Sequence, residues 1–318
     1  MNLRNAMVSA AGGRKRRRNR WRRMVPFYIM VLPGLLYLLL NNYIPMFGIL
    51  IAFKNMNFQK GILGSPWCGF DNFSFLFSSS AGWEILRNTV GYNVLFHIVG
   101  TILAIFVAIL INEICSRRVK KLYQSLLLLP YLISWVIVSY LVYAYFAADT
   151  GLVNNSILKP LGLEGIIWYQ EPKYWPFLLL FFNVWKGIGY SMIVYLSSIV
   201  GISSDYFEAA RIDGAGKWKQ IRYITLPLLK PTIITLAILA VGGIFRSDFG
   251  LFYQVPRNSG ILYPVTRTLD VYVYQALLQN ADYGMSSAAS VYQSVVGFVM
   301  IVLTNAAIRK HEPDSALY

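Results

Sequence analysis

Residues 24–53 read MVPFYIMVLPGLLYLLLNNYIPMFGILIAF, a stretch of the chain without Asp, Glu, Lys or Arg. A helix needs about 20 mostly apolar residues to cross the roughly 30 Å hydrocarbon layer of a bilayer. A secretory signal instead has an apolar core of about 7–15 residues followed by a small-residue cleavage pattern. The stretch is longer than that core and no such pattern follows it, so it predicts a retained membrane-spanning helix.

Further charge-free stretches occupy 88–112, 122–148, 187–204 and 283–308. The third of these extends back through 174–185 if Lys186 is admitted inside a helix. Another candidate begins after Pro231 and contains Arg246 and Asp248. The sequence therefore predicts an all-α polytopic membrane protein with six transmembrane helices, at 27–50, 89–112, 122–147, 176–200, 232–254 and 286–308.

The composition indicates the same class. Hydrophobic residues make up 56% of the 318 residues and charged residues 14%, whereas soluble globular proteins contain about 25% charged residues. Aromatic residues account for 15% of the chain, which excludes a disordered protein because such chains are poor in aromatic side chains.

The basic residues that give the net charge of +15 are unevenly distributed. Nine of the 29 Lys and Arg precede residue 24, next to the first predicted helix, where basic clusters meet anionic lipid and fix orientation rather than bind nucleic acid. A cytoplasmic N-terminus places 20 basic residues inside and seven outside. We therefore expect both termini in the cytoplasm, with a basic tail at 1–26, a transmembrane domain at 27–310 and a C-terminal tail at 311–318.

Catalytic and metal-binding motifs are not apparent in the sequence. It has two histidines and two widely spaced cysteines, and it contains neither a His-Glu-x-x-His nor a Gly-x-Ser-x-Gly pattern. The segment 214–217 is similar to part of a phosphate loop, but Trp218 stands where a Ser or Thr should bind Mg²⁺. The sequence predicts a chain without catalytic residues, metal site or bound cofactor.

The predicted cytoplasmic loop between the fourth and fifth helices is the most informative segment. Asp205, with Glu208 three residues later, is a variant of the capping box that begins a helix. Gly214 and Gly216 are expected to end that helix, because glycine adopts the left-handed conformation of a helix end. A second short helix is expected to follow, up to Pro227.

The spacing in this loop resembles the EAA loop of membrane subunits of bacterial ABC importers: Glu-Ala-Ala, three residues, Gly, nine residues, then Ile-x-Leu-Pro. The candidate coupling residues within 205–227 are Glu208, Ala209, Ala210, Asp213, Gly214, Ile224, Leu226 and Pro227. The likeness extends over roughly 25–310. The segments that look like the polysaccharide-type permeases of carbohydrate importers are 249–260, 262–264, 283–285 and 292–298.

The resemblance implies a type I ABC importer permease in the bacterial inner membrane. It implies a second, related permease subunit and two ATPase subunits, which would bind ATP and Mg²⁺ and dock on the EAA loop. It also implies an external solute-binding protein that delivers an oligosaccharide. ATP-driven closure of the ATPases would then switch the pathway between its two faces.

Polar and charged residues inside predicted helices are the candidates for lining a solute pathway, since such groups usually face a bundle interior or a water-filled cavity. Aromatic rings cover the apolar face of a sugar, and amide or charged groups bind its hydroxyls. The alternative is packing, or structural charge pairing. Arg246 and Asp248, two apart on a predicted helix, should not both face one point. The candidates are Asn183, Trp185, Lys186, Tyr190, Arg246, Asp248, Tyr253 and Gln254.

Two other classes of function are weaker interpretations. An ion-coupled secondary transporter would need internal repeats, broken half-helices or intramembrane carboxylates, and Asp248 is the one acid well inside a predicted helix. A membrane-embedded enzyme would need a reactive group of residues near the headgroups. Neither class has a use for an EAA loop.

Overall fold

The structure of the protein, a computed structural model, describes residues 24–311. The cluster of basic residues in the predicted N-terminal tail and nearly all of the C-terminal tail lie outside this range. Within it the chain is helical, and the single isolated bridge joins Lys54 to Trp67. Five helices are long and apolar enough to cross a membrane, and a bent pair makes a sixth. The predicted all-α polytopic class is confirmed.

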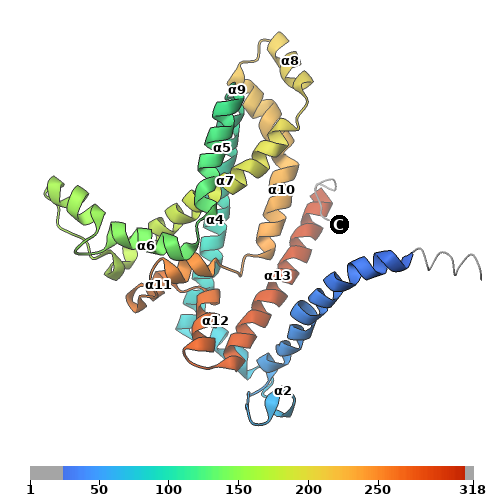
Figure 1. Ribbon diagram of the computed structural model, residues 1–318, viewed down its shortest axis with the longest axis vertical. Helices are drawn as coiled ribbons and strands as arrows, with labels where there is room; N and C mark the ends of the chain where they lie inside the picture. The colour runs from blue at the N-terminus through green and yellow to red at the C-terminus, as the bar shows by residue number, and fades with distance from the viewer. Residues whose placement is uncertain (1–23, 312–318) are drawn as a thin grey trace, which may run out of the picture.

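The long helices are the first helix Met24–Phe53, α4 (Ser80–Asn112), α5 (Arg117–Leu132), α6 (Trp135–Phe146), α7 (Trp175–Val200), α10 (Leu226–Gly242) and α13 (Tyr283–His311). Of these, α4, α5, α7, α10 and α13 form a bundle along the longest axis of the molecule, whereas α6 lies across it (Figure 1). Shorter α-helices connect them: α2 (Gly61–Gly64), α3 (Ser74–Ser78), α8 (Ser204–Ile212), α9 (Lys217–Gln220), α11 (Tyr263–Thr266) and α12 (Leu269–Leu278). The π-helical segments used below are η8 (Ile221–Thr225) and η9 (Gly250–Gln254).

The bundle is centred on α7, which packs against both α4 and α5. Apolar side chains such as Ala104, Ala108, Met192 and Leu196 pack together in a buried cluster between α4 and α7. A Cβ added at Gly189 on α7 would lie 2.0 Å from a backbone oxygen of α5. Glycine is required there because the two helices touch through their backbones.

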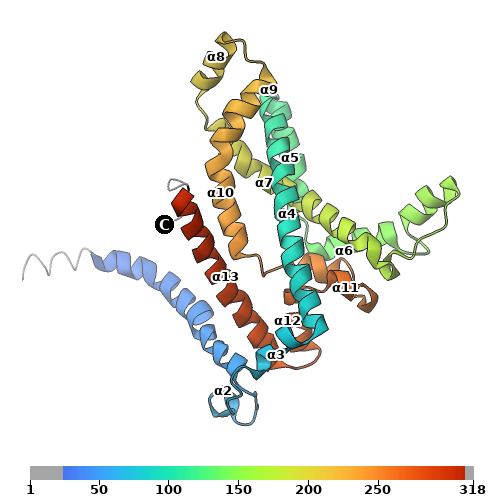
Figure 2. The same ribbon diagram turned by 180° about the vertical axis from the view of Figure 1, so that it is seen from behind.

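The first helix stands away from this bundle. Its N-terminal part diverges from the other helices in both views (Figures 1 and 2), and none of the residues in its most apolar window is buried. Only its last part, Ile44–Phe53, packs against α13, where Ala52 becomes fully buried. An apolar surface about 18 residues long is thus left for lipid or for another protein.

The third predicted span is not one continuous helix. α5 and α6 meet at a bend of 93°, so the prediction of a single helix over 122–147 is wrong. Pro130 lies in the last turn of α5, and Ser134 caps α6 by accepting a hydrogen bond from the Ile137 amide at 3.4 Å. A proline near the end and a serine cap together stop one helix and begin the next.

The fifth predicted span differs as well. α10 ends at Gly242, and residues 243–248 are not helical, so the prediction of a helix over 232–254 is wrong. Arg246 and Asp248 therefore lie in a linker, and the argument that helical spacing separates them does not apply. A Cβ at Gly242 would lie 2.2 Å from the Ile301 side chain of α13, so the end of α10 is tightly packed.

The connection between α6 and α7 is folded around Asn154, which is buried. Its amide nitrogen donates to the carbonyls of Ala148 at 2.9 Å and Ile166 at 2.8 Å, and its oxygen accepts from the Trp168 indole at 2.9 Å. This polar centre holds together a segment made of short helical turns.

Candidate functional site

The segment that follows α7 begins with a capped helix. The Ser203 hydroxyl accepts a hydrogen bond from the Asp205 amide at 3.3 Å and caps α8. The predicted cap, Asp205, lies instead in the first turn, where a carboxylate interacts favourably with the helix dipole. The helix therefore begins slightly earlier than predicted, because serine is an equally good cap.

α8 ends in a Schellman motif. The Gly214 amide donates to the Arg211 carbonyl at 3.0 Å, and the Ala215 amide donates to the Ala210 carbonyl at 2.8 Å. These two bonds define the motif, which needs a left-handed residue just after the helix. Gly214 supplies it with a φ of 76°, so the glycine of the EAA spacing ends the helix as predicted.

Gly216 plays a different part from the one predicted. Its φ of −68° and ψ of 167° are extended, and it precedes α9 rather than ending α8. The helix that begins at Lys217 continues through η8 and α10 to Gly242, so the expected end near Pro227 is also wrong. Proline is tolerated inside a membrane helix when a local π-helical turn adjusts the backbone, and η8 directly precedes α10.

The candidate coupling residues are distributed over α8, the following turn, η8 and the start of α10. Exposed are Glu208, Ala209, Asp213, Gly214, Leu226 and Pro227, and half-buried are Ala210 and Ile224. Large apolar side chains beside them are also exposed: Tyr206 by 58%, Ile212 by 87% and Trp218 by 71%. Large apolar side chains exposed within one short segment make that segment a candidate interaction surface. We call α8, the following turn and α9 the docking segment.

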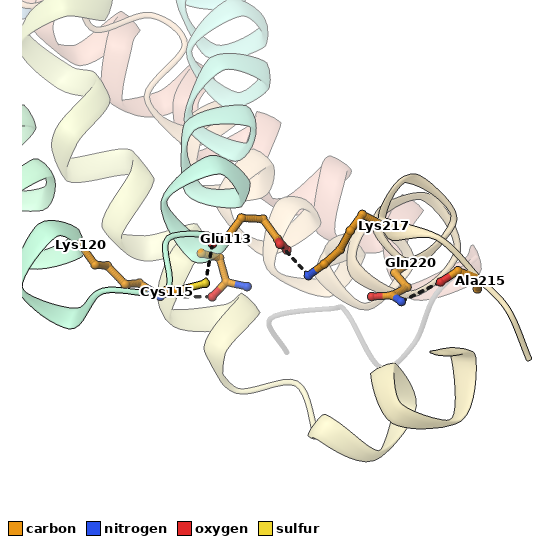
Figure 3. A network of polar contacts seen from close by, with 7 residues as sticks. Glu113, Cys115, Lys120, Ala215, Lys217 and Gln220 are labelled. Carbon is orange, nitrogen blue, oxygen red and sulfur yellow. Dashed lines mark hydrogen bonds and ion pairs between the residues drawn. The ribbon is translucent and has the colours of Figure 1, made fainter. Parts of the chain in front are cut away.

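One polar contact attaches the docking segment to the bundle, and another orders the segment itself (Figure 3). The Lys217 ammonium pairs with the Glu113 carboxylate just beyond α4, at 2.6 Å. The Gln220 side chain, which is buried, donates to the Ala215 carbonyl at 2.8 Å and holds the turn against α9. A cavity of about 330 Å³ lies between the docking segment and the ends of α4 and α7, and Glu208 lines it.

Two cavities lie among α4, α7 and α10, and three predicted pathway residues line them. A cavity of about 550 Å³ is lined by Asn183 and Asp248 together with His97. A second, of about 240 Å³, is lined by Asn183, His97 and Tyr190. Asn183 and His97 thus line both cavities and place polar side chains among mostly apolar lining residues.

Lys186 and Trp185 occupy structural positions instead. The Lys186 ammonium donates to the Tyr131 carbonyl at 2.8 Å and to that of Pro130 at 3.5 Å, at the end of α5. A cation at a helix C-terminus stabilises the unpaired carbonyls. Trp185 packs against a hydrophobic core, and the Tyr190 ring stacks on Tyr131 at 5.0 Å between centroids.

The linker 243–248 is held by side chains from three distant helices. Asn93 of α4 donates to the Arg246 carbonyl at 2.7 Å, and Gln293 of α13 donates to the carbonyl of residue 245 at 2.8 Å. Asp270 of α12 accepts from the Ser247 amide at 2.5 Å. Non-helical backbone at membrane depth is stable only when its polar groups are paired in this way.

Asp248 closes the linker and caps the next helical segment. One carboxylate oxygen accepts from the amides of Gly250 at 2.9 Å and Leu251 at 3.3 Å, and the other accepts from the Trp135 indole at 2.6 Å. The side chain of Arg246 is exposed. Asp248 therefore joins η9 to the bend between α5 and α6, where Lys186 also lies.

The last two predicted pathway residues line a smaller cavity of about 230 Å³ between α6 and η9, which we call the α6 cavity. Tyr253 and Gln254 share it with Arg257 and Asn258, which were not predicted to line a pathway. Both residues lie in the segment 249–260 that resembles carbohydrate permeases, and the run from Pro256 to Gly260 has the composition of a turn. It gave no indication that the turn would face α6.

Within the described part of the chain, no group of three or more His, Cys, Asp or Glu side chains is arranged to bind a metal ion. Cys68 and Cys115 are both free thiols. The amide, carboxylate and aromatic groups of the cavities are the kind that orient a polar solute.

A family model described as "Binding-protein-dependent transport system inner membrane component" matches residues 100–311. The polygalacturonan/rhamnogalacturonan transport system permease protein YteP of Bacillus subtilis (strain 168) is 34% identical over 283 residues, which cover 89% of this chain and 87% of the relative.

Two crystal structures contain a chain of similar fold. One is of a bacterial ABC transporter involved in the import of the acidic polysaccharide alginate, with a TM-score of 0.83 and 32% identity over 93% of this chain and 99% of that one. The other is of a bacterial alginate ABC transporter in complex with an alginate pentasaccharide-bound periplasmic protein, with a TM-score of 0.82 and 32% identity over 92% and 96%. The chain belongs to the family of binding-protein-dependent transport system inner membrane components and has the fold of an ABC importer permease.

Proposed function

We propose that this protein is the transmembrane subunit of an ATP-driven importer in the bacterial inner membrane. It forms the pathway for an oligosaccharide or polysaccharide fragment that an external solute-binding protein delivers. The observation that carries the proposal is the docking segment: a capped helix with Glu208 and exposed apolar side chains, in a chain of this family.

The docking segment is the proposed contact with an ATPase subunit, which binds ATP and Mg²⁺ in place of this chain. Small Ala209 and Ala210 allow close approach of a partner, while Glu208 offers a charge for pairing. The excess of basic residues on the same side supports a cytoplasmic location for this end of the molecule. The opposite end then faces the solute-binding protein.

A second permease subunit is supported by the first helix. Its apolar window has no buried residue, so the single chain leaves this surface open. A related membrane subunit packed against it would enclose a pathway between the two chains. The remaining exposed apolar surface would face membrane lipids.

The pathway residues that we propose are Asn183, Tyr190 and Asp248, around the two cavities among α4, α7 and α10. Lys186 supports the pathway by holding the end of α5, and Trp185 supports it by packing against the hydrophobic core. The relatives suggest the class of sugar, since YteP is named for polygalacturonan and rhamnogalacturonan, and alginate is described as an acidic polysaccharide. An acidic oligosaccharide is therefore the proposed solute.

The proposal is tested by purifying the tagged protein from its native membrane and measuring ATPase activity in nanodiscs with a sugar-loaded binding protein. We expect a second permease and an ATPase to co-purify, and we expect the loaded binding protein to stimulate hydrolysis. Glu208→Lys should abolish stimulation while the two permeases stay together. Glu164→Lys, an equal charge reversal at an exposed site away from the docking segment, is the matched control. A stable homo-oligomer without an ATPase would contradict the proposal.

A further inference from the structure

The α6 cavity lies between α6 and the turn after η9. In both views α6 lies well away from α8 of the docking segment (Figures 1 and 2). The volume of the cavity is about 230 Å³. Pockets for drug-sized ligands measure roughly 300–1,000 Å³, so this one suits a single ring of a longer chain. Its lining residues are Val136, Ser139, Tyr140, Tyr253, Gln254, Arg257 and Asn258.

Arg257 is the charged group of this cavity. Its guanidinium carbon lies 4.2 Å from the ring centroid of Tyr143 and 5.9 Å from that of Tyr140. A guanidinium resting on aromatic rings keeps its N–H donors available at its edge. The ion pairs found within residues 24–311 are Lys173–Glu171 and Lys217–Glu113, so no carboxylate of the described chain neutralises Arg257.

The backbone fixes where Arg257 points. Arg257 and Asn258 are consecutive residues with left-handed φ values of 55° and 51°, a conformation that residues other than glycine rarely adopt. The amide of Asn258 donates to the Tyr253 carbonyl at 3.1 Å, and its side-chain oxygen accepts from Gln275 at 2.7 Å and from the Tyr263 hydroxyl at 3.0 Å. Unusual backbone held in this way is concentrated at functional sites.

The charge of Arg257 also reaches the surrounding tyrosines. Burial raises the pKa of the Tyr169 hydroxyl, and the nearby Arg257 guanidinium offsets part of this rise. Tyr169 in turn packs edge-on against Tyr143 at 5.7 Å between centroids. Arg257 is therefore surrounded by aromatic rings and by amides, with no anion among them.

We propose that this cavity binds a uronate residue of the solute at the outer mouth of the pathway, with Arg257 pairing to the sugar carboxylate. Guanidinium and carboxylate groups form paired, charge-assisted hydrogen bonds of fixed geometry. Tyr140 supplies an aromatic ring for the apolar side of the sugar, and Gln254 supplies an amide for its hydroxyls. The Tyr253 ring stacks on Phe249 at 4.8 Å between centroids and forms part of the cavity wall. The proposal rests on the proposed function and adds to it a site and a preference for charge.

The test compares ATP-dependent uptake of a tri-galacturonate with that of its carboxyl-reduced, neutral counterpart in the reconstituted complex. The binding protein is saturated with each sugar, so that its own affinity does not limit the rate. Arg257→Gln should lower the ratio of acidic to neutral uptake about tenfold, and Arg257→Lys should lower it less. Glutamine and lysine carry a Cβ as arginine does, so neither substitution adds backbone strain at the left-handed position 257. Lys173→Gln is the control: it removes an exposed cation that pairs with Glu171, and the uptake ratio should not change.

Each other outcome overturns the site. If the wild-type complex imports the acidic sugar and Arg257→Gln imports it equally well, the site is wrong and the importer stands. An equal loss for both sugars would mean that Arg257 serves docking of the binding protein. If the loss of uptake in Arg257→Gln depends on the fraction of anionic lipid in the membrane, Arg257 binds a lipid headgroup and not the sugar. A wild-type complex that imports neither sugar overturns both the site and the proposed function.

Discussion

Replacing Gly214 with alanine is expected to loosen the docking segment without a steric clash. No heavy atom lies within 4 Å of a Cβ added there, so the effect comes from the φ of 76° alone. The left-handed conformation costs a residue with a Cβ roughly 1–2 kcal/mol. That energy corresponds to a factor of about 5–30 in the population of the closed turn.

The assay is hydrogen exchange of a peptide covering 204–216 in the assembled complex. The Ala215 amide, bonded to the Ala210 carbonyl at 2.8 Å, reports directly on the closed turn. Gly214→Ala should speed its exchange about 5–30-fold, in keeping with that energy, and ATP-coupled uptake should fall. Gly214→Asn should have a smaller effect, because asparagine tolerates the left-handed region.

Gly216→Ala is the matched control. It lies two residues away, in the same open surroundings, but its φ of −68° suits any residue. Exchange of the Ala215 amide should therefore stay as in the wild type. Equal acceleration in the Gly214 and Gly216 variants, or none in Gly214→Ala, would refute the reasoning.

Two further predictions concern the contacts around the docking segment and the cavities. The side chains of Lys217 and Glu113 are 60% and 41% exposed, so a double-mutant cycle of Glu113→Gln and Lys217→Gln, read by unfolding of the complex, should give a coupling below about 1 kcal/mol that weakens with salt. A coupling above about 2 kcal/mol would contradict a surface ion pair. Asn183→Ala and Asp248→Asn should each slow uptake in complexes that still assemble, since asparagine preserves the helix cap. Unchanged kinetics for both would remove these two residues from the pathway.

The helices that could be predicted well are those whose ends coincide with charges. Both ends of the first helix and the end of α4 were predicted to within a few residues, because a long apolar run is what a membrane-spanning helix requires. The start of α4 was placed too late. The bend between α5 and α6 was missed although Pro130 marks it. An apolar run continues through the bend, so hydropathy gives no sign of a change in direction.

The linker after α10 could not be predicted, since its stability depends on residues far away in the sequence. Asn93, Asp270 and Gln293 satisfy its backbone, and no local pattern reveals such partners. The turn at Gly214 is the opposite case. Its hydrogen bonds are all local, so the position of one glycine was enough to predict where α8 ends. Arg257 was missed because its left-handed backbone is held by tertiary contacts and not by glycine.

The uninterrupted helix from Lys217 to Gly242 relates the two ends of the molecule by simple geometry. It has 26 residues, which at 1.5 Å per residue make a rod of roughly 39 Å. One end bears α8, and the other is tied by the linker to α4, α12 and α13. A rotation of about 10° around the tied end would displace the free end of such a rod by roughly 7 Å. When the docking segment moves by several ångströms, the other end of the helix, near Asp248, therefore rotates by only a few degrees. The side-chain hydrogen bonds of the linker can remain formed during so small a rotation.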